Sequence, residues 1–306
     1  MDMIEVYDLT KHYGGFKAVD NVSFNVKEGE IFGFLGPNGA GKTTTIKAIL
    51  HLVNISSGEI KINGLDVKKN EKEVKRNIGY LPENVAFYDN LTALQNLYFY
   101  ADIKNASRAE CMSLLEEFRL KDSAYRRVGK FSKGMIQRLG MIQAILGEPR
   151  LLILDEPTAG LDPRGVVLIR KKIQELNRRG VTIFLSSHIL SEVQEICDRV
   201  GIINRGVLIA QDTVQNLSKK LDIKPKISIE LEKISDQILD AIKKVEGVEG
   251  IDVLENTVDV ICSSGVKAKV VVAIENAGGK IINLRTREPS LEEVFMKYTE
   301  EGVEGA

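Results

Sequence analysis

The chain has few cysteines and no long apolar run. Cys111, Cys197 and Cys262 stand far apart among 306 residues, and such an odd, scattered set argues against a disulfide framework or a cysteine-rich metal site. The longest unbroken apolar runs, such as 97–101 and 270–274, have five residues, whereas crossing a bilayer takes roughly 20. The N-terminus has no basic stretch followed by an apolar one, so we expect no secretory signal and a cytoplasmic protein.

Net charge is also nearly absent, because 42 Lys and Arg oppose 43 Asp and Glu. With 43% hydrophobic and 28% charged residues, the composition excludes intrinsic disorder and a fibrous repeat as the main character of the chain. The charge is unevenly distributed: residues 1–225 carry 32 basic and 27 acidic side chains, whereas residues 226–306 carry 10 and 16. A Lys-rich polar stretch at 217–225 ends in a proline. We therefore expect a first domain at 1–216, a linker at 217–225 and a second domain at 226–306.

The first domain alternates short apolar runs with helical patterns, which predicts an α/β fold with a largely parallel sheet. An antiparallel edge is expected from the runs at 4–9, 19–26 and 60–62, and a helical subdomain from about 84–143. Within that subdomain, Thr92 and Gln95 are spaced as a capping box. The buried strands of the parallel core are expected at 31–35, 151–154, 181–185 and 200–203.

The second domain follows a different order, βαββαβ, which is typical of a ferredoxin-like α+β sandwich. Its strands are expected at 227–231, 251–254, 258–261 and 281–287, and its helices at 235–245 and 266–276. A final helix should start at Ser290, with Glu293 completing a capping box. This part of the sequence has no evident metal ligands or catalytic cluster.

The segment Gly36-Pro-Asn-Gly-Ala-Gly-Lys42-Thr43 matches the pattern G-x-x-x-x-G-K-[ST] directly after the expected strand 31–35. Glycines let the backbone curl so that its N–H groups point at phosphate oxygens, and the start of the following helix favours an anion. Lys42 would reach the β- and γ-phosphates, and the Thr43 hydroxyl would coordinate Mg²⁺. The alternative is an ordinary glycine turn. The residues predicted to bind the nucleotide here are Gly36, Pro37, Asn38, Gly39, Ala40, Gly41, Lys42, Thr43 and Thr44.

A pair of carboxylates, Asp155 and Glu156, follows the expected strand 151–154. Asp155 suits Mg²⁺, directly or through water, and Glu156 can polarise the water that attacks a γ-phosphate. A solvated turn is the alternative. Together with the glycine-rich loop, the pair predicts Mg²⁺-dependent nucleotide hydrolysis, and a kinase, a GTPase or a motor remains possible at this point.

The order and spacing of three further segments distinguish among these classes. The segments are Phe131-Ser-Lys-Gly-Met-Ile-Gln-Arg138, Ala159-Gly-Leu-Asp162 and Ser187-His188. Over residues 1 to about 215 the sequence resembles the ATP-binding cassette (ABC) family. The family signature is usually L-S-G-G-Q, from which Phe131, Lys133 and Met135 depart. The resemblance implies a P-loop NTPase with ATP and Mg²⁺ as cofactors.

The resemblance also implies roles for single residues. His188 would touch the γ-phosphate and the attacking water, and Tyr13 would stack on adenine. Ser132 and Gly134 would contact the γ-phosphate of a nucleotide bound by another subunit, and Asp162 would help to align the two subunits. Taken alone, Ser132 and Asp162 could equally be plain helix N-caps, and Tyr13 could be a structural surface residue.

Glu83 stands where the family usually has glutamine, and it can still bind Mg²⁺ or water through oxygen. Three features together resemble the ATPases of an exporter subgroup that serves drug, polysaccharide or sodium export. They are the glutamate at position 83, the sequence Ser-Lys-Gly-Met, and the tail Arg287-Glu-Pro-Ser-Leu-Glu-Glu-Val-Phe295. Five aromatic residues after Glu83 would be suited to line a groove that binds a helix of a membrane partner. Some of them would instead form the core of the helical subdomain. These are Phe87, Tyr88, Tyr98, Phe99 and Tyr100.

The resemblance therefore implies the ATP-hydrolysing subunit of an ABC exporter. It would form an ATP-bound homodimer, or pair with a related ATPase, and drive a separate transmembrane permease at the cytoplasmic face of the membrane. A regulatory ABC ATPase without a transport role is the main alternative. A cassette acting on DNA or ribosomes fits less well, because the acidic second domain is a poor nucleic-acid surface.

Overall fold

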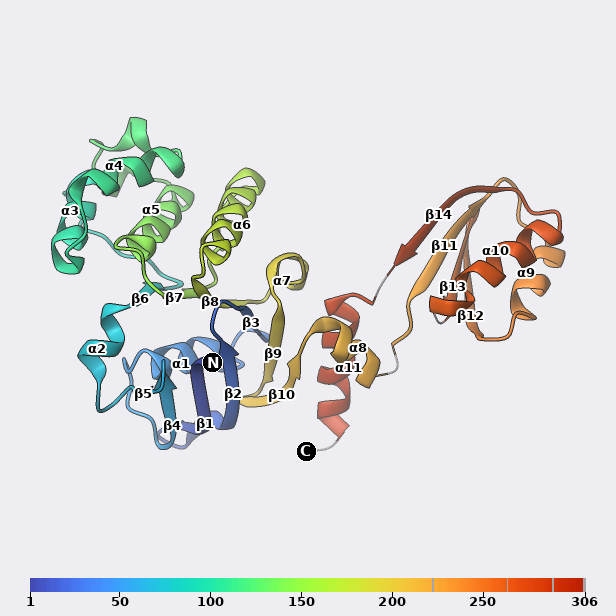
Figure 1. Cartoon of the computed structure of the whole chain (residues 1–306), viewed down its shortest axis with the longest axis horizontal. Coiled ribbons are helices and arrows are strands. Elements are labelled where there is room, and N and C mark those ends of the chain that lie inside the picture. Colours follow the sequence, from blue (N-terminus) through green and yellow to red (C-terminus); the bar gives the residue numbers. More distant parts are fainter. Residues whose placement is uncertain (222, 263, 288, 305–306) are drawn as a thin grey trace. The chain divides into compact units, whose positions relative to one another are not determined.

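The computed structural model describes residues 1–221, 223–262, 264–287 and 289–304. The chain divides into two compact units, Met1–Asp212 and Thr213–Ala306 (Figure 1). The division precedes the expected linker at 217–225, because residues 217–220 complete the helix α8 (Val214–Lys220). Thr213 caps that helix by accepting a hydrogen bond from the Asn216 amide at 3.1 Å. The first four residues of the expected linker, 217–220, therefore belong to a capped helix.

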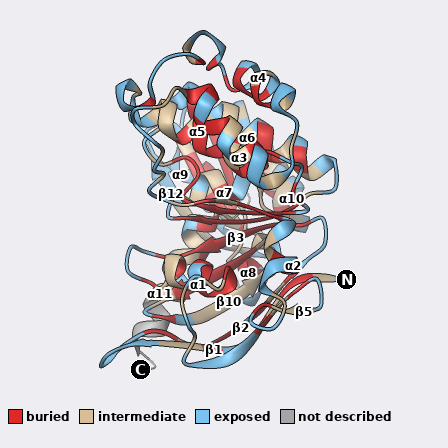
Figure 2. Cartoon of the chain, turned by 90° about the vertical axis from the view of Figure 1, so that its left-hand side faces the viewer, coloured by how far each residue is buried: buried red, intermediate tan, exposed pale blue. Residues whose placement is uncertain are grey.

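A six-stranded sheet forms the centre of the first unit, in the order β10-β9-β3-β8-β7-β6. All neighbouring strands are parallel except β9 and β10. The four strands predicted for the parallel core are all present, and the apolar residues of β3, β7 and β8 are buried (Figure 2). The strands are β3 (Ile31–Leu35), β6 (Ile78–Leu81), β7 (Leu151–Asp155), β8 (Thr182–Ser187), β9 (Arg199–Asn204) and β10 (Val207–Asp212).

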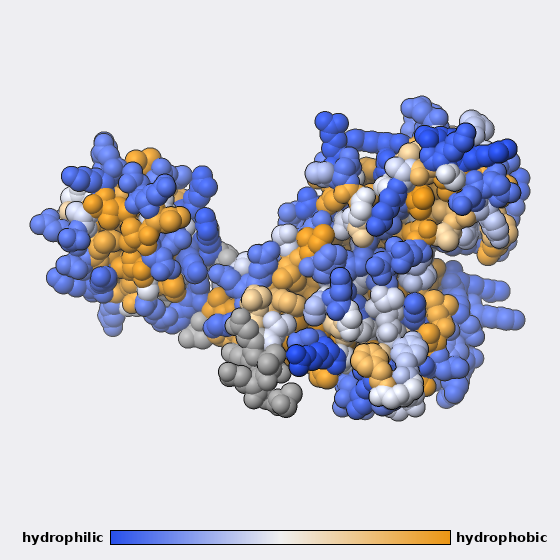
Figure 3. Space-filling view, turned by 180° about the vertical axis from the view of Figure 1, so that it is seen from behind, coloured by the Kyte–Doolittle hydropathy of each residue, from blue (hydrophilic) through white to orange (hydrophobic). Residues whose placement is uncertain are grey.

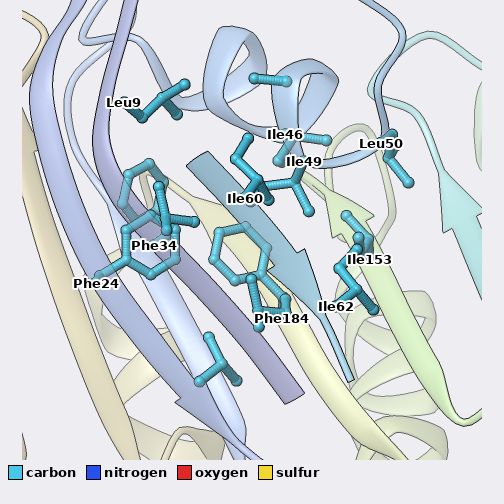
Figure 4. Close-up of a cluster of buried hydrophobic side chains, with 14 of the residues drawn as sticks. Leu9, Phe24, Phe34, Ile46, Ile49, Leu50, Ile60, Ile62, Ile153 and Phe184 are labelled. Atoms are coloured by element: carbon cyan, nitrogen blue, oxygen red, sulfur yellow. The ribbon is translucent and has the colours of Figure 1, made fainter. Parts of the chain in front are cut away.

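A four-stranded antiparallel sheet, in the order β2-β1-β4-β5, confirms the predicted antiparallel edge. Its apolar side chains and those of α1 (Lys42–Ile49) meet the central sheet in one core (Figure 4). The Phe24 ring stacks on Phe34 and Phe184, with centroids 5.3 and 5.8 Å apart. Each fully buried side chain of this kind stabilises the fold by about 1.5–3 kcal/mol, so α1 is held firmly between the sheets. The strands are β1 (Asp2–Tyr13), β2 (Phe16–Lys27), β4 (Ser57–Ile62) and β5 (Leu65–Asp66).

The helical subdomain is inserted between β6 and β7. The predicted capping box is present: Thr92 Oγ1 accepts from the Gln95 amide at 3.2 Å, and Gln95 Oε1 accepts from the Thr92 amide at 2.9 Å. A Cβ atom on Gly79 would lie 2.1 Å from the Ala144 carbonyl oxygen, so a glycine on β6 lets α5 approach the sheet closely. The helices are α3 (Ala93–Lys104), α4 (Arg108–Glu117) and α5 (Lys133–Ile145), with 3₁₀ turns at Lys121–Ser123 and Val128–Lys130.

Three more helices complete the first unit. α2 (Glu71–Arg76) precedes β6, α6 (Pro163–Arg178) follows β7 and α7 (Leu190–Ile196) follows β8. Across the part of the chain that the structure describes, no helix combines the length and the apolar character that a bilayer span requires.

The second unit confirms the predicted ferredoxin-like order. Its antiparallel sheet has the strand order β12-β13-β11-β14, and α9 and α10 bury their apolar sides against it. In the view of Figure 3, apolar side chains gather on one face of this unit within a ring of hydrophilic ones. The elements are β11 (Lys226–Leu231), α9 (Asp236–Lys243), β12 (Val248–Leu254), β13 (Thr257–Cys262), a 3₁₀ turn (Ser264–Val266), α10 (Lys267–Asn276) and β14 (Ile281–Arg287).

The last helix, α11 (Leu291–Glu304), packs on α8. The predicted capping box at its start is present, because the Glu293 amide donates to Ser290 Oγ at 3.1 Å and the Ser290 amide donates to Glu293 Oε2 at 2.9 Å. Residue 288 of the tail that suggested an exporter lies outside the described residues.

Candidate functional site

The glycine-rich loop connects β3 to α1 in a space that admits little beyond backbone. A Cβ atom on Gly36 would lie 2.3 Å from the Ile203 carbonyl oxygen. Gly41 has φ +107°, and its Cβ would lie 2.6 Å from the Ala18 carbonyl oxygen. The Ala40 carbonyl accepts a hydrogen bond from the Gly206 amide at 2.9 Å, which ties the loop to the β9–β10 turn. The loop is thus fixed at the start of α1, where backbone N–H groups favour an anion.

Lys42 is the first residue of α1 and is buried, with only 6% of its surface exposed. Its ammonium group donates to the carbonyl oxygens of Gly36 at 2.7 Å and Pro37 at 3.3 Å, and lies 3.4 Å from Glu156 Oε1. The side chain therefore turns back over the loop, where a phosphate group would lie.

Asp155 ends β7 and is fully buried. Its Oδ1 accepts a hydrogen bond from Ser186 Oγ at 2.6 Å, whereas Oδ2 is buried and has no hydrogen-bond partner within the described ranges. A buried carboxylate oxygen without a donor is costly unless something pairs with it, and a cation would do so.

Glu156 has φ +52°, in the left-handed region that is unusual for a residue with a side chain. Its amide donates to the Ser186 carbonyl at 3.3 Å and to Ser186 Oγ at 3.1 Å. This backbone turn sends the carboxylate between two basic groups: Oε1 faces Lys42, and Oε2 lies 2.8 Å from His188 Nδ1. Glu156 is buried, while about half of the His188 side chain is exposed. Lys42, Glu156 and His188, which lie far apart in the sequence, therefore meet at the Glu156 carboxylate.

A pocket of about 490 Å³ opens over this group. Most of the predicted site residues line it, whereas Gly36, Ala40 and Asp155 are buried and do not belong to its lining. The lining consists of Tyr13, Phe16, Ala18, Pro37, Asn38, Gly39, Gly41, Lys42, Thr43, Thr44, Glu83, Glu156, Ala159 and His188. A larger cavity, of about 860 Å³, lies elsewhere against α4 and α6 and contains neither the loop nor the acidic pair.

The donor set fits Mg²⁺ held jointly with a nucleotide. Thr43 and Glu83 line the pocket, and Asp155 Oδ2 is buried without a hydrogen-bond partner within the described ranges. Burial raises the pKa of Tyr80 to about 12, and the neighbouring charges of Asp155 and Glu83 add to the shift. Tyr80 is therefore neutral at physiological pH. Among the described residues, no group of three or more His, Cys, Asp or Glu side chains could hold a metal alone.

Ser132, Gly134 and Asp162 do not line the pocket. Ser132 is the N-cap of α5 and accepts from the Met135 amide at 3.3 Å. Asp162 is the N-cap of α6 and accepts from the Gly165 amide at 2.8 Å. Both residues are therefore helix N-caps, as the alternative interpretation expected. If they contact a nucleotide, it would be one bound outside the pocket of their own chain.

Five residues of the site were not predicted. Phe16, Ala18 and Ala159 line the pocket, while Ser186 and Gln137 contact the backbone of Glu156. Four of them had a signal in the sequence: Gln137 and Ala159 stand in the segments 131–138 and 159–162 that carry the family resemblance. Phe16 mirrors Tyr13 across the Gly-Gly turn and pairs with it, and Ser186 is a polar residue directly after the strand expected at 181–185.

The family comparisons agree with this geometry. The family model for ABC transporter domains matches residues 19–159, and the model for the C-terminal domain of DrrA1-3-like ATP-binding proteins matches residues 213–299. The bacitracin transport ATP-binding protein BcrA of Bacillus licheniformis is 46% identical over 220 residues, which cover 71% of this chain and 72% of that protein. The chain belongs to the ATP-binding subunits of ABC transporters. As such it binds ATP and couples ATP hydrolysis to transport.

Two further matches extend the likeness. The linearmycin resistance ATP-binding protein LnrL of Bacillus subtilis (strain 168) is 34% identical over 305 residues, covering 97% of this chain and 98% of that protein. A bacterial ABC transporter cassette solved as a dimer has 25% identity and a TM-score of 0.65, covering 69% of this chain and 99% of that one. The ABC resemblance predicted for residues 1 to about 215 is confirmed.

Proposed function

We propose that the chain powers drug export by hydrolysing Mg²⁺-ATP at the cytoplasmic face of the membrane, on a separate transmembrane permease. The names of the two relatives refer to bacitracin transport and linearmycin resistance, which supports export of a toxic compound. Neither name supports the alternative of a regulatory ATPase without a transport role.

The observation that carries the proposal is the position of the Glu156 carboxylate between Lys42 and His188. Lys42 would turn from its carbonyl contacts to the β- and γ-phosphates, and Glu156 would accept a proton from the attacking water. His188 would orient Glu156 and contact the γ-phosphate. Thr43, Glu83 and Asp155 would hold Mg²⁺, which supplies positive charge to the phosphate oxygens when bound.

Two subunits would share each nucleotide. Ser132, Gly134 and Asp162 lie outside the pocket of their own chain, and we assign them to the nucleotide of a second subunit, which is either another copy or a related ATPase. The dimeric relative supports this arrangement. ATP would then join the subunits and hydrolysis would separate them, which would move the permease between two states.

The test is Glu156→Gln. Removing the base should lower ATP hydrolysis at least about 100-fold, in line with the usual contribution of general acid–base catalysis, while ATP still binds and traps a dimer that gel filtration detects. Glu116→Gln, on the exposed surface of α4, is the control and should hydrolyse normally. Normal turnover by Glu156→Gln would remove Glu156 from the role of base.

The transport coupling has its own test. The chain should co-purify with an integral membrane protein that stimulates its ATPase activity. If no membrane partner binds, the regulatory alternative gains support over export.

A further inference from the structure

The turn that carries Glu156 is held from two sides. Its left-handed backbone costs of the order of 1–3 kcal/mol and persists only where the surroundings fix it. Ser186 holds the amide of Glu156 from the β8 side. On the opposite side, the Gln137 side-chain amide donates to the carbonyl oxygens of Glu156 at 3.3 Å and Pro157 at 3.1 Å. The peptide plane after Glu156 is therefore fixed by a side chain from α5.

Gln137 belongs to the helix that starts at Ser132. Only 3% of its surface is exposed, so both hydrogen bonds form away from water, where a lost partner is expensive. The same end of α5 packs on the loop that follows Glu156. A Cβ on Gly160 would lie 2.7 Å from Lys133 Cε, and one on Gly134 would lie 3.5 Å from Leu161 Cδ2. The first turns of α5 and the loop from 156 to 161 thus form one packed unit.

We propose that Gln137 is a positioning residue for hydrolysis: from α5 it sets the backbone of the 156–157 turn, and thereby the direction in which the Glu156 carboxylate points. In this backbone conformation the carboxylate faces Lys42 and His188. The inference rests on the proposed function and deepens it. Because Ser132 begins the same helix and is assigned to the nucleotide of the second subunit, Gln137 links the state of that nucleotide to the catalytic carboxylate of its own site.

The first test is Gln137→Leu, which removes the two donors at similar volume. Hydrolysis at saturating ATP (kcat) should fall about 10- to 100-fold, the equivalent of two lost buried hydrogen bonds, while ATP binding and KM change less than about twofold. Gln137→Met, an unbranched variant, serves if the leucine lowers the melting temperature. Gln143→Leu makes the same change at a half-buried position of α5 and should leave kcat unaltered.

The second test separates positioning from a general loss of structure. If Gln137 acts through Glu156, then Gln137→Leu should lower the residual hydrolysis of Glu156→Gln by less than about twofold, because the two losses are not additive. The double variant should still form the ATP-bound dimer.

Three results would overturn the inference: an unchanged kcat in both Gln137 variants, a loss of ATP binding that parallels the loss of hydrolysis, or additive losses in the double variant. If the single variant Glu156→Gln does not trap a dimer, the result counts against the proposed two-subunit mechanism and not against the role of Gln137. The comparison of kcat with KM in Gln137→Leu does not depend on a trapped dimer.

Discussion

The ammonium group of Lys42 lies 3.4 Å from Oε1 of Glu156, and each side chain is less than one tenth exposed. The pair joins the first residue of α1 to the turn after β7, two segments that are remote in sequence. A phosphate group that engages Lys42 would take a share of this attraction, so nucleotide binding would be coupled to the environment of the Glu156 carboxylate through one side chain.

Replacing Lys42 with methionine keeps the length of the side chain and removes its charge. A charge-assisted hydrogen bond contributes about 1.5–3 kcal/mol, so ATP binding should weaken about 10- to 100-fold in a fluorescent-nucleotide titration. Lys47→Met, on the exposed side of the same helix, is the control and should bind ATP normally. Equal binding by the Lys42 variant would show that the loop amides alone hold the phosphates.

The glycines of the loop should not be equally replaceable. Gly41 and Gly39 both have positive φ, but a Cβ on Gly41 meets the Ala18 carbonyl at 2.6 Å, whereas a Cβ on Gly39 has no neighbour within 4 Å. Alanine at Gly39 should cost about 1 kcal/mol of backbone strain, and alanine at Gly41 clearly more, because a clash adds to the strain. Urea unfolding measures both. Equal losses would mean that the loop relaxes away from Ala18.

The positions of the phosphate loop and the acidic pair could be predicted because each directly follows an apolar strand, and parallel strands bring their carboxyl ends to one edge. The βαββαβ order of the second unit could be predicted for a similar reason, since apolar periodicity is a local signal. Ser186 and Gln137 show the limit of that method. Both act through backbone contacts with Glu156, and a contact between remote segments leaves no periodic pattern.

Strand β10 and helix α8 show a second limit. β10 was not among the expected strands, although its first four residues are apolar and Arg205 and Gly206, just before it, both have positive φ as in a tight turn. The Lys-rich stretch near 217 suggested a linker by composition, although Leu217 is buried and Thr213 caps the helix. Cationic side chains in the last turn of a helix are favourable, so a Lys-rich stretch is as compatible with the end of a helix as with a linker.

Two aromatic rings, Tyr13 and Phe16, flank the β1–β2 turn at the rim of the pocket. Stacking on a base contributes about 1–3 kcal/mol, so alanine at the ring that holds adenine should weaken ATP binding about 5- to 100-fold. We expect the larger loss at Tyr13. Tripolyphosphate lacks a base, so its binding should be equal in both variants and the wild type. A loss confined to Phe16→Ala would transfer the stacking role to that residue.

Lys104, at the end of α3, caps the end of α5. Its ammonium group donates to the carbonyl oxygens of Gln143 at 2.8 Å, Ala144 at 3.2 Å and Leu146 at 3.1 Å. Lys104→Met leaves these acceptors without their donor, which should cost about 1–3 kcal/mol at pH 7. Urea unfolding provides the measurement, and Lys121→Met, at an exposed lysine, should cost much less.

The same cap predicts a pH dependence. Burial lowers the pKa of Lys104 from 10.5 to about 8, an effect that Glu110 partly opposes. Between pH 8 and 10.5 the unfolded chain therefore binds more protons at this residue than the folded chain, so its contribution to the free energy of unfolding rises with pH. The stability difference between wild type and Lys104→Met should accordingly grow from pH 8 to pH 10. A constant difference across that range would mean that the folded protein holds this proton as tightly as the unfolded chain does, and that the three carbonyls offset the cost of burial.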